Sequence, residues 1–176
     1  LLMDKEKEKV GQNIKYELVL LFSRGHGVEG PLFDTMVASY LLDSERKSHG
    51  LDSLAREFLS YEPIPITDLI GTGPKQVPIH EVNPELLARY AGEDAEVAFR
   101  LWKVMEPALR EAQLEELFLQ TELPLVRVLA DMEWWGVKLD LQLLEGIRTE
   151  FAEKLERLRD QIWQAAGRVF NVDSPK

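Results

Sequence analysis

Apolar residues recur at spacings of three and four along much of the chain beyond residue 84. The longest such series follows Asp140 and consists of Leu144, Ile147, Phe151, Leu155, Leu158 and Ile162. Most residues between them are polar or charged, which is the pattern of a long amphipathic helix. Because Asp140 is a favoured N-cap and Gly167 a favoured stop, we predict a helix between them that packs one face on one partner.

Three helices and one strand are predicted before residue 61. Residues 12–22 have a helical pattern that ends at 24–30, a segment with three glycines. Residues 31–43 indicate a short strand entering a helix, and residues 51–60 indicate an amphipathic helix. Residues 1–10 are a charged, solvated lead-in.

The segment 61–84 contains five prolines and two glycines, which favour turns and a loop. Asn83 and Pro84 then mark a helix start, since Asn caps well and proline fits the first helical position. Helices are predicted over residues 84–106, 108–121 and 124–136, the last ending at Gly136. These elements predict an α/β fold that is mostly helical, with a domain boundary between residues 107 and 122.

The charge balance limits the classes of function. The chain has 31 acidic and 21 basic residues and a formal net charge of −10, which argues against a basic nucleic-acid platform. Metal-dependent nucleases remain allowed, because their sites are rich in carboxylates. The chain has no cysteine, which excludes disulfides, zinc thiolates and thiol nucleophiles and is compatible with the cytoplasm. No apolar run is long enough for a membrane-spanning helix.

Asp94 occupies a position where the pattern of its helix predicts an apolar side chain. The seam of that helix consists of Leu87, Ala91, Ala98, Leu101 and Met105. Asp94 continues the four–three alternation of this seam, whereas Glu93 and Glu96 lie off it and are expected to be solvated. Tyr90 lies four residues before Asp94, so the phenol and the carboxylate share one face.

Glu17 interrupts a second apolar seam, on the helix predicted for residues 12–22. It lies three residues after Ile14 and four before Leu21, on the face that they share with Leu18. A carboxylate on an apolar face is costly unless a cation, a metal ion or hydrogen-bond donors satisfy it. Glu17 and Asp94 together suit two-metal phosphodiester hydrolysis; the alternative is that each forms a buried ion pair with Arg or Lys.

Several segments resemble, in order and spacing, the A-family bacterial DNA polymerases of the polymerase I type. Four segments resemble the second half of the 3'-5' proofreading exonuclease domain: VGQNIKYE, LFDTMVASYLLD, LDSLAREFL and RYAGEDAEVAFRLW. Two further segments resemble the start of the polymerase domain, at the base of the thumb: ELPLVRVLADMEWWGVKLD and FNVDSPK. The resemblance implies a partial ribonuclease H-like exonuclease domain in residues 1–110, followed by long thumb helices in residues 111–176.

The resemblance also implies roles for individual residues, in a site where four carboxylates hold two divalent metal ions, Mg²⁺ or Mn²⁺. Asp94 matches the last metal-binding Asp, and Tyr90 matches the Tyr that orients the attacking water. Asn13 and Tyr16 match the Asn and the aromatic residue near the 3'-terminal nucleotide. Glu17 stands where the family has an Asp ligand, so its carboxylate is displaced by one methylene in a geometry that tolerates little displacement.

Two carboxylates of that site, an Asp and a Glu two residues apart on a strand, are expected to precede Leu1, since nothing in residues 1–10 matches them. The polymerase carboxylates are expected to follow Lys176. We therefore expect a fragment of an enzyme of DNA replication and repair that retains neither the metal ions nor activity by itself. The intact enzyme would be a cytoplasmic monomer that binds a single-stranded 3' end at the exonuclease site and primer–template DNA at the thumb.

Two other hypotheses are compatible with part of the pattern. A ribonuclease D-like 3'-exoribonuclease shares the Tyr/Asp motif, but it predicts a different helical domain after residue 110. A non-catalytic helical interaction module would require that Asp94 is held in an ion pair and that the chain binds no metal.

Overall fold

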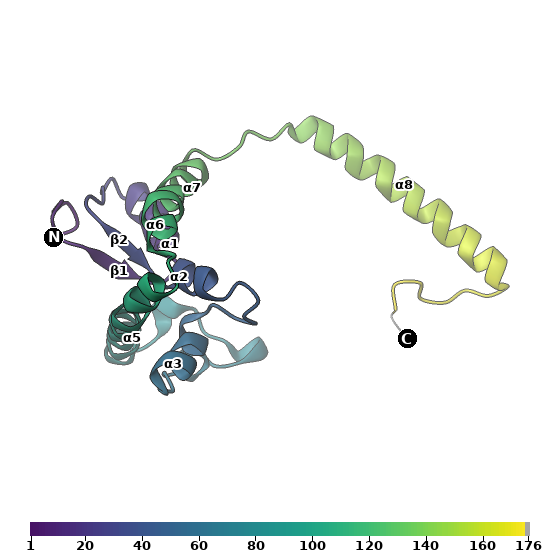
Figure 1. Ribbon diagram of the computed structural model, residues 1–176. Coiled ribbons are helices and arrows are strands. Elements are labelled where there is room, and N and C mark those ends of the chain that lie inside the picture. The colour runs from purple at the N-terminus through teal and green to yellow at the C-terminus, as the bar shows by residue number, and fades with distance from the viewer. Residues whose placement is uncertain (175–176) are drawn as a thin grey trace. The chain divides into compact units, whose positions relative to one another are not determined.

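The computed structural model describes residues 1–174, apart from the side chain of Lys75. The chain divides into two compact units, Leu1–Trp135 and Gly136–Lys176, and each is described by itself (Figure 1). The first unit combines two short strands with most of the helices. The second consists mainly of one long helix and a short tail.

The sheet of the first unit is built from two parallel strands, β1 (Lys9–Gly11) and β2 (Leu32–Asp34), with Val10 opposite Phe33. Helix α1 (Ile14–Ser23) connects them, because parallel strands need a crossover. The strand and helix predicted within residues 31–43 and the helix predicted over 12–22 are thus confirmed.

Strand β1 corrects the prediction that residues 1–10 are only a solvated lead-in. The charged Lys9 makes the strand pattern hard to recognise in the sequence. In the structure its ammonium group donates to the backbone oxygens of Asp4 and Glu29, the latter at 2.5 Å. A strand of three half-buried residues has too few alternating positions to be recognised by periodicity.

Five helical elements follow β2 before Pro84, and the last three of them lie within the proline-rich segment. Their bounds are α2 (Thr35–Leu42), α3 (Leu51–Leu59), α4 (Ile66–Ile70), η1 (Gly73–Lys75) and η2 (Ile79–Glu81). The predicted amphipathic helix at 51–60 is confirmed as α3. The segment 61–84, expected to be turns and loop, also contains the single turns α4, η1 and η2.

Helix α5 (Pro84–Glu111) begins as predicted, with the Asn83 side chain accepting from the Glu85 N–H at 2.8 Å. It does not end near residue 106: it continues through Pro107, and no separate helix begins at 108. Proline inside a helix costs about 3 kcal/mol. Met105 and Leu109, both buried, flank the proline, so packing holds the helix intact there.

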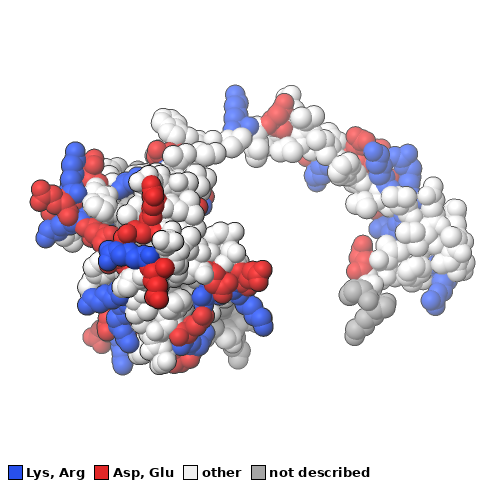
Figure 2. All heavy atoms as spheres, in the orientation of Figure 1, with Lys and Arg blue, Asp and Glu red and all other residues white. Residues whose placement is uncertain are grey.

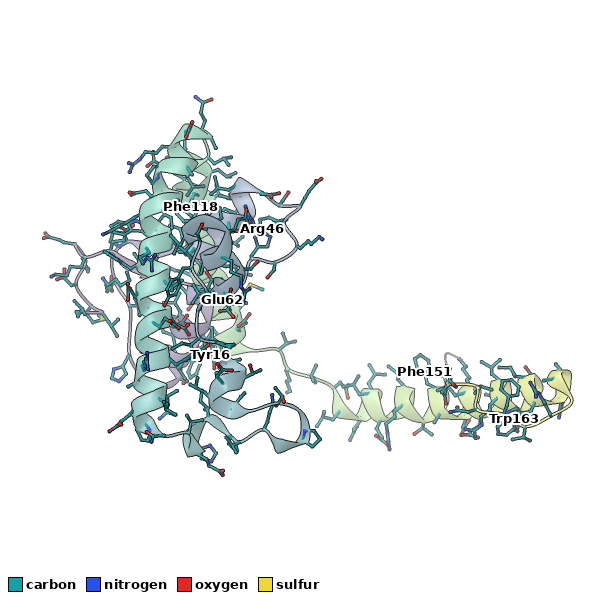
Figure 3. The ribbon with its side chains drawn as sticks, turned by 90° about the horizontal axis from the view of Figure 1, so that it is seen from below. Tyr16, Arg46, Glu62, Phe118, Phe151 and Trp163 are labelled. Carbon is teal, nitrogen blue, oxygen red and sulfur yellow. The ribbon has the colours of Figure 1, made fainter. Side chains whose placement is uncertain are left out.

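Three short-to-medium helices complete the first unit: α6 (Glu115–Leu117), the π-helix η3 (Phe118–Glu122) and α7 (Leu123–Trp135). Phe118 of η3 is 1% exposed and packs against Phe33, with ring centroids 4.9 Å apart (Figure 3). The core around this pair includes the fully buried side chains of Leu18, Leu54, Leu101, Met105 and Leu109.

Helix α7 packs against α1 and the loop that follows it. The Arg127 guanidinium donates to the carbonyl oxygens of Val28 and Gly30, each at 2.8 Å, and Lys15 pairs with Glu133. The compact unit therefore extends beyond residue 110 to Trp135. The division into an exonuclease part, 1–110, and a polymerase part, 111–176, remains a prediction.

The second unit contains α8 (Leu141–Ala166), with the predicted ends: the Asp140 carboxylate accepts from two N–H groups of the first turn, and Gly167 follows with φ 67°. None of its described residues is buried, and its apolar series is 38–67% exposed. The predicted helix is confirmed, but the described residues of this unit do not cover its apolar face. Phe151 and Trp163 project from it in Figure 3.

Candidate functional site

A cleft of about 520 Å³ opens in the first unit, and both seam-interrupting carboxylates, Glu17 and Asp94, line it. Its walls come from β1, α1, α5 and the start of α3. Most lining side chains are apolar, among them Ile14, Leu18 and Ala98. The structure thus brings together two carboxylates that lie 77 residues apart in the sequence (94 − 17).

Asp94 faces the cleft because only one end of the α5 seam is covered by the core. Leu101 and Met105 at the end of the seam are buried in the core, whereas Ala91, Asp94 and Ala98 of the same seam line the cleft. The Oδ1 atom of Asp94 is buried and has no hydrogen-bond partner among the described residues. Burial raises the pKa of Asp94, a hydrogen bond from Tyr90 opposes the rise, and the charges of Asp52 and Glu93 add to it.

Tyr90 is half-buried one turn before Asp94. Burial, followed by the negative charge of Asp94, raises the pKa of Tyr90 to about 12. The phenol therefore keeps its proton at neutral pH and can donate a hydrogen bond to the carboxylate or to a nearby oxygen.

Glu17 differs from its prediction in one respect. Ile14 and Leu18, which share its face, are buried as expected, but the Glu17 side chain is exposed at the edge of the cleft. The loss of contact with water on the cleft side raises the pKa of Glu17, its own backbone N–H opposes the rise, and the charge of Asp34 adds to it.

Asn13 and Tyr16 lie at the N-terminal end of α1, outside the set of residues that line the cleft. Asn13 has left-handed backbone angles, φ 56° and ψ 48°, and an exposed side chain. Tyr16 is 66% exposed (Figure 3). Both are accessible to a ligand that enters over the start of α1.

The alternative of buried ion pairs is not supported for either carboxylate. Among the described side chains, neither Glu17 nor Asp94 forms an ion pair with Lys, Arg or His. Carboxylate oxygens suit Mg²⁺ and Mn²⁺, and the unpartnered Asp94 Oδ1 fits a metal ligand. The described residues contain no group of three or more His, Cys, Asp or Glu side chains that could hold a metal. Among the described residues, Glu17 and Asp94 are therefore two carboxylates at one cleft without a cationic partner.

Two residues that support this site were missed from the sequence. Asp34, 1% exposed, accepts four backbone N–H groups at the start of α1 and α2. Glu93, expected to be solvated, accepts from the Tyr61 hydroxyl at 2.6 Å and the Ile64 N–H at 2.7 Å, and so fastens the segment after α3 to α5. The role of Asp34 could have been recognised from the sequence, since an Asp between an apolar strand and a helix is a typical N-cap. No local sequence pattern indicates the role of Glu93.

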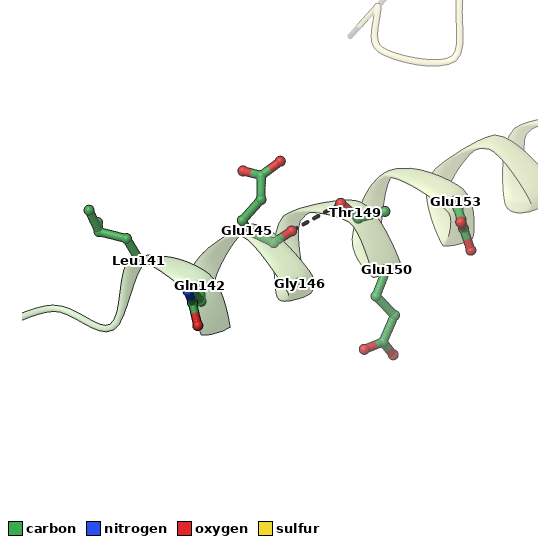
Figure 4. A pocket seen from close by; sticks show the side chains of 7 residues that line it. All are labelled: Leu141, Gln142, Glu145, Gly146, Thr149, Glu150 and Glu153. Carbon is green, nitrogen blue, oxygen red and sulfur yellow. Dashed lines mark hydrogen bonds between the residues drawn. The ribbon is translucent and has the colours of Figure 1, made fainter.

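A second hollow runs along α8 and has a different character (Figure 4). All seven lining residues belong to that one helix, and three of them are glutamates. Glu145 pairs with Arg148 at 2.5 Å and Glu150 with Lys154 at 2.6 Å. These charges are already neutralised along the helix, so this hollow is a helix surface and not a site.

Surface charge agrees with the low density of basic residues expected from the sequence. On the face shown in Figure 2, acidic and basic side chains are interspersed. No helix of the described part of the chain combines the length and apolar character that a membrane span requires.

Comparison with curated proteins gives consistent relatives. DNA polymerase I of Rhizobium leguminosarum is 42% identical over 177 residues, which cover 100% of this chain and 17% of the relative. DNA polymerase I of Pseudomonas aeruginosa is 37% identical over 179 residues, covering 100% and 20%. The chain thus spans about a fifth of the length of these relatives.

Solved structures agree. The POL domain of Pol1 from M. smegmatis, in complex with DNA primer-template and dNTP, superposes with a TM-score of 0.76 and 25% identity, covering 99% of this chain and 27% of that one. Brucella melitensis NrnC shares the fold at a TM-score of 0.58 and 23% identity, covering 78% and 65%. The weaker match does not favour the ribonuclease D-like alternative, and the predicted fold class is confirmed.

The match to a family model completes the comparison. The model described as 3'-5' exonuclease matches residues 1–110, which contain both α1 and the cleft-lining part of α5. This chain therefore belongs to the 3'-5' exonuclease family, in the form found in bacterial DNA polymerase I.

Proposed function

We propose that this chain supplies about half of the proofreading site of a longer DNA polymerase of the polymerase I type, which removes nucleotides from a single-stranded 3' end. The observation that carries the proposal is the cleft shared by Glu17 and Asp94, with one Asp94 oxygen buried and unpartnered. A buried acceptor without a donor costs about 1–3 kcal/mol, a cost that a bound cation would remove.

Asp94 and Glu17 are the proposed ligands of Mg²⁺ or Mn²⁺. Held by these carboxylates, divalent ions would activate water for attack and neutralise charge on the phosphate. Tyr90, a phenol at neutral pH, would donate to the attacking water or hold it toward Asp94. Asn13 and Tyr16, exposed at the start of α1, would contact the 3'-terminal nucleotide.

The rest of the proposal concerns the longer protein. The two further carboxylates would come from an Asp-x-Glu strand in a preceding segment. Residues 111–176 would begin the polymerase domain at the base of the thumb and help to hold primer–template DNA. The enzyme would act as a cytoplasmic monomer with Mg²⁺ or Mn²⁺ as cofactor.

The test measures hydrolysis of 3'-labelled single-stranded DNA by the polymerase that contains this chain. Removing a direct ligand by Asp94→Ala should lower the rate more than the roughly 10–100-fold typical of an outer-shell partner. Glu96→Ala is the matched control, because Glu96 lies on the same helix, is exposed and does not line the cleft. Equal rates for Asp94→Ala and the control would refute the proposal.

Glu17→Asp tests whether the longer side chain limits the reaction. Restoring the family's shorter ligand should preserve or raise the rate, and a large loss would instead mean that this cleft is adapted to Glu. The 176-residue chain alone should show no metal-dependent degradation of single-stranded DNA. Robust activity of the chain alone that Asp94→Ala abolishes would refute the idea that half of the site lies elsewhere.

A further inference from the structure

One buried carboxylate, that of Asp34, caps two helices at once. It ends β2 and accepts from the N–H groups of Met36 at 2.9 Å and Val37 at 3.3 Å, at the start of α2. It also accepts from the N–H groups of Asn13 at 3.1 Å and Ile14 at 2.8 Å, at the start of α1. The first pair is an ordinary N-cap; the second pair reaches a helix 20 residues earlier in the chain.

The contact to α1 changes what Asn13 can do. An Asn at an N-cap normally turns its side chain back onto the N–H groups of its own helix. Here Asn13 makes no such bond. Its left-handed backbone instead aims its N–H and that of Ile14 at the Asp34 carboxylate, as successive N–H groups do around an anion. The Asn13 amide is left exposed and unengaged among the described residues.

The same contact fixes Glu17. Glu17 lies one turn after Asn13 on a helix whose first N–H groups are held by Asp34 and whose Lys15 is paired with Glu133 of α7. Without the Asp34 contact, the first turn of α1 would have no side-chain cap, and uncapped first turns fray. The position of Glu17 at the edge of the cleft therefore depends on Asp34.

We infer that Asp34 is a positioning residue, which holds the start of α1 so that Glu17 faces the cleft and the Asn13 amide stays free for a ligand. This inference rests on the proposed function of the cleft. It assigns a role to a side chain that does not line the cleft and was not predicted to belong to the site.

The structure suggests a selective variant. Oδ1 of Asp34 accepts from Asn13, Met36 and Val37, whereas Oδ2 accepts from Ile14 alone. Asp34→Asn can therefore keep the three Oδ1 bonds while its amide group faces the Ile14 N–H, donor against donor. Asp140→Asn is the matched control, because Asp140 caps only its own helix, in the other unit.

The experiment uses the polymerase that contains this chain. Its readouts are the MnCl₂ concentration needed for half-maximal hydrolysis of 3'-labelled single-stranded DNA and, in the metal-free protein, hydrogen exchange at Ile14. In Asp34→Asn, exchange at Ile14 should accelerate, and the MnCl₂ concentration for half-maximal hydrolysis should rise about 10-fold, as for other supporting partners of metal ligands. Asp140→Asn should change neither. Near-UV circular dichroism checks that the fold persists. If the Asn variant does not fold, Asp34→Ser keeps a cap for α2 and still releases α1.

The outcomes separate the two proposals. If the wild type hydrolyses DNA in a MnCl₂-dependent way, Asp94→Asn abolishes hydrolysis and folded Asp34→Asn needs the same MnCl₂ concentration as the wild type, the inference is overturned while the proposed function stands. If exchange at Ile14 is unchanged in the folded variant, the inference is also overturned. If the wild type shows no MnCl₂-dependent hydrolysis, the proposed function fails and the inference falls with it.

Discussion

The two long helices, α5 and α8, are built on similar sequence patterns but have different surroundings. They contain 28 and 26 residues, each begins at a capping side chain, and each carries an apolar seam. Five residues of α5 are buried, whereas none of α8 is. Helical periodicity therefore predicts which face is apolar, but a partner element decides whether that face forms a core.

The forces that hold the two helices differ accordingly. α8 relies on its length, its Asp140 cap and pairs such as Glu150–Lys154, each worth about 0.2–0.5 kcal/mol. α5 relies on burial against α2 and α3, which is strong enough to carry Pro107 in its interior. The variants below test this contrast, from the largest expected effect to the smallest.

Leu101→Ala should have the largest effect. Leu101 is 0% exposed at the centre of the core, so its truncation should lower the free energy of unfolding of the first unit by about 2–5 kcal/mol. Leu155→Ala, on α8 and 67% exposed, should stay within about 0.5 kcal/mol. Urea unfolding followed by tryptophan fluorescence and far-UV circular dichroism measures both. Equal losses would mean that α8 is covered in solution.

Arg127→Met should lower the free energy of unfolding of the first unit by about 1–3 kcal/mol, since two backbone carbonyls lose a charged donor. Arg157→Met is the control on α8, where the guanidinium donates to a carbonyl of its own helix. The same urea titration compares them. An Arg127 variant as stable as the control would mean that α7 does not hold the loop after α1.

Asp94→Asn should stabilise the first unit at pH 7, by about 1 kcal/mol, because the amide carries no charge, whereas the partly buried Asp94 carboxylate is charged and poorly hydrated. Because the pKa of Asp94 is raised on folding, the stability linked to its proton is present below its unfolded value of about 3.9 and is lost as the pH rises through the folded value. The gain should therefore disappear near pH 3. The measurement compares the melting temperatures of the wild type, Asp94→Asn and the exposed control Glu96→Gln at pH 7 and pH 3. A loss of stability at pH 7 would indicate a structural role for the carboxylate.

Asp140→Ala should cost about 1 kcal/mol or less, and only locally, in the first turn of α8. Hydrogen exchange at Gln142 and Leu143 should accelerate while the unfolding of the first unit is unchanged. Asn83→Ala, the equivalent change at α5, should instead lower the unfolding midpoint of the first unit slightly, because α5 is part of its core. Identical behaviour of the two variants would remove the distinction between the helices.

The sequence was informative where the interactions are local. The caps Asn83 and Asp140, the stop at Gly167 and the apolar face of α1 depend on neighbouring residues, and all were predicted. The passage of α5 through Pro107 was not, because it depends on packing of side chains from distant segments. The strand β1 was missed because three residues carry almost no periodic signal.

The candidate site followed the same rule. Asp94 and Glu17 were recognisable because each interrupts a local apolar pattern, and the structure adds that both line one cleft. The bonds of Asp34 to α1 and of Glu93 to the segment after α3 span 20 to 32 residues, and no local pattern records them. The roles of Asp94 and Glu17 as metal ligands, of Tyr90 toward the attacking water, and of Asn13 and Tyr16 as substrate contacts remain predictions.

The packing of α7 on α1 has a consequence for synthesis on the ribosome. The contact between Arg127 and Val28 spans 99 residues, so the loop after α1 has emerged long before the helix that fastens it exists. A nascent chain that stops at residue 110 would contain the whole segment that the family model matches, yet α1, which carries Glu17, would lack its covering helix. The segment that matches the exonuclease family, residues 1–110, is therefore shorter than the compact unit Leu1–Trp135.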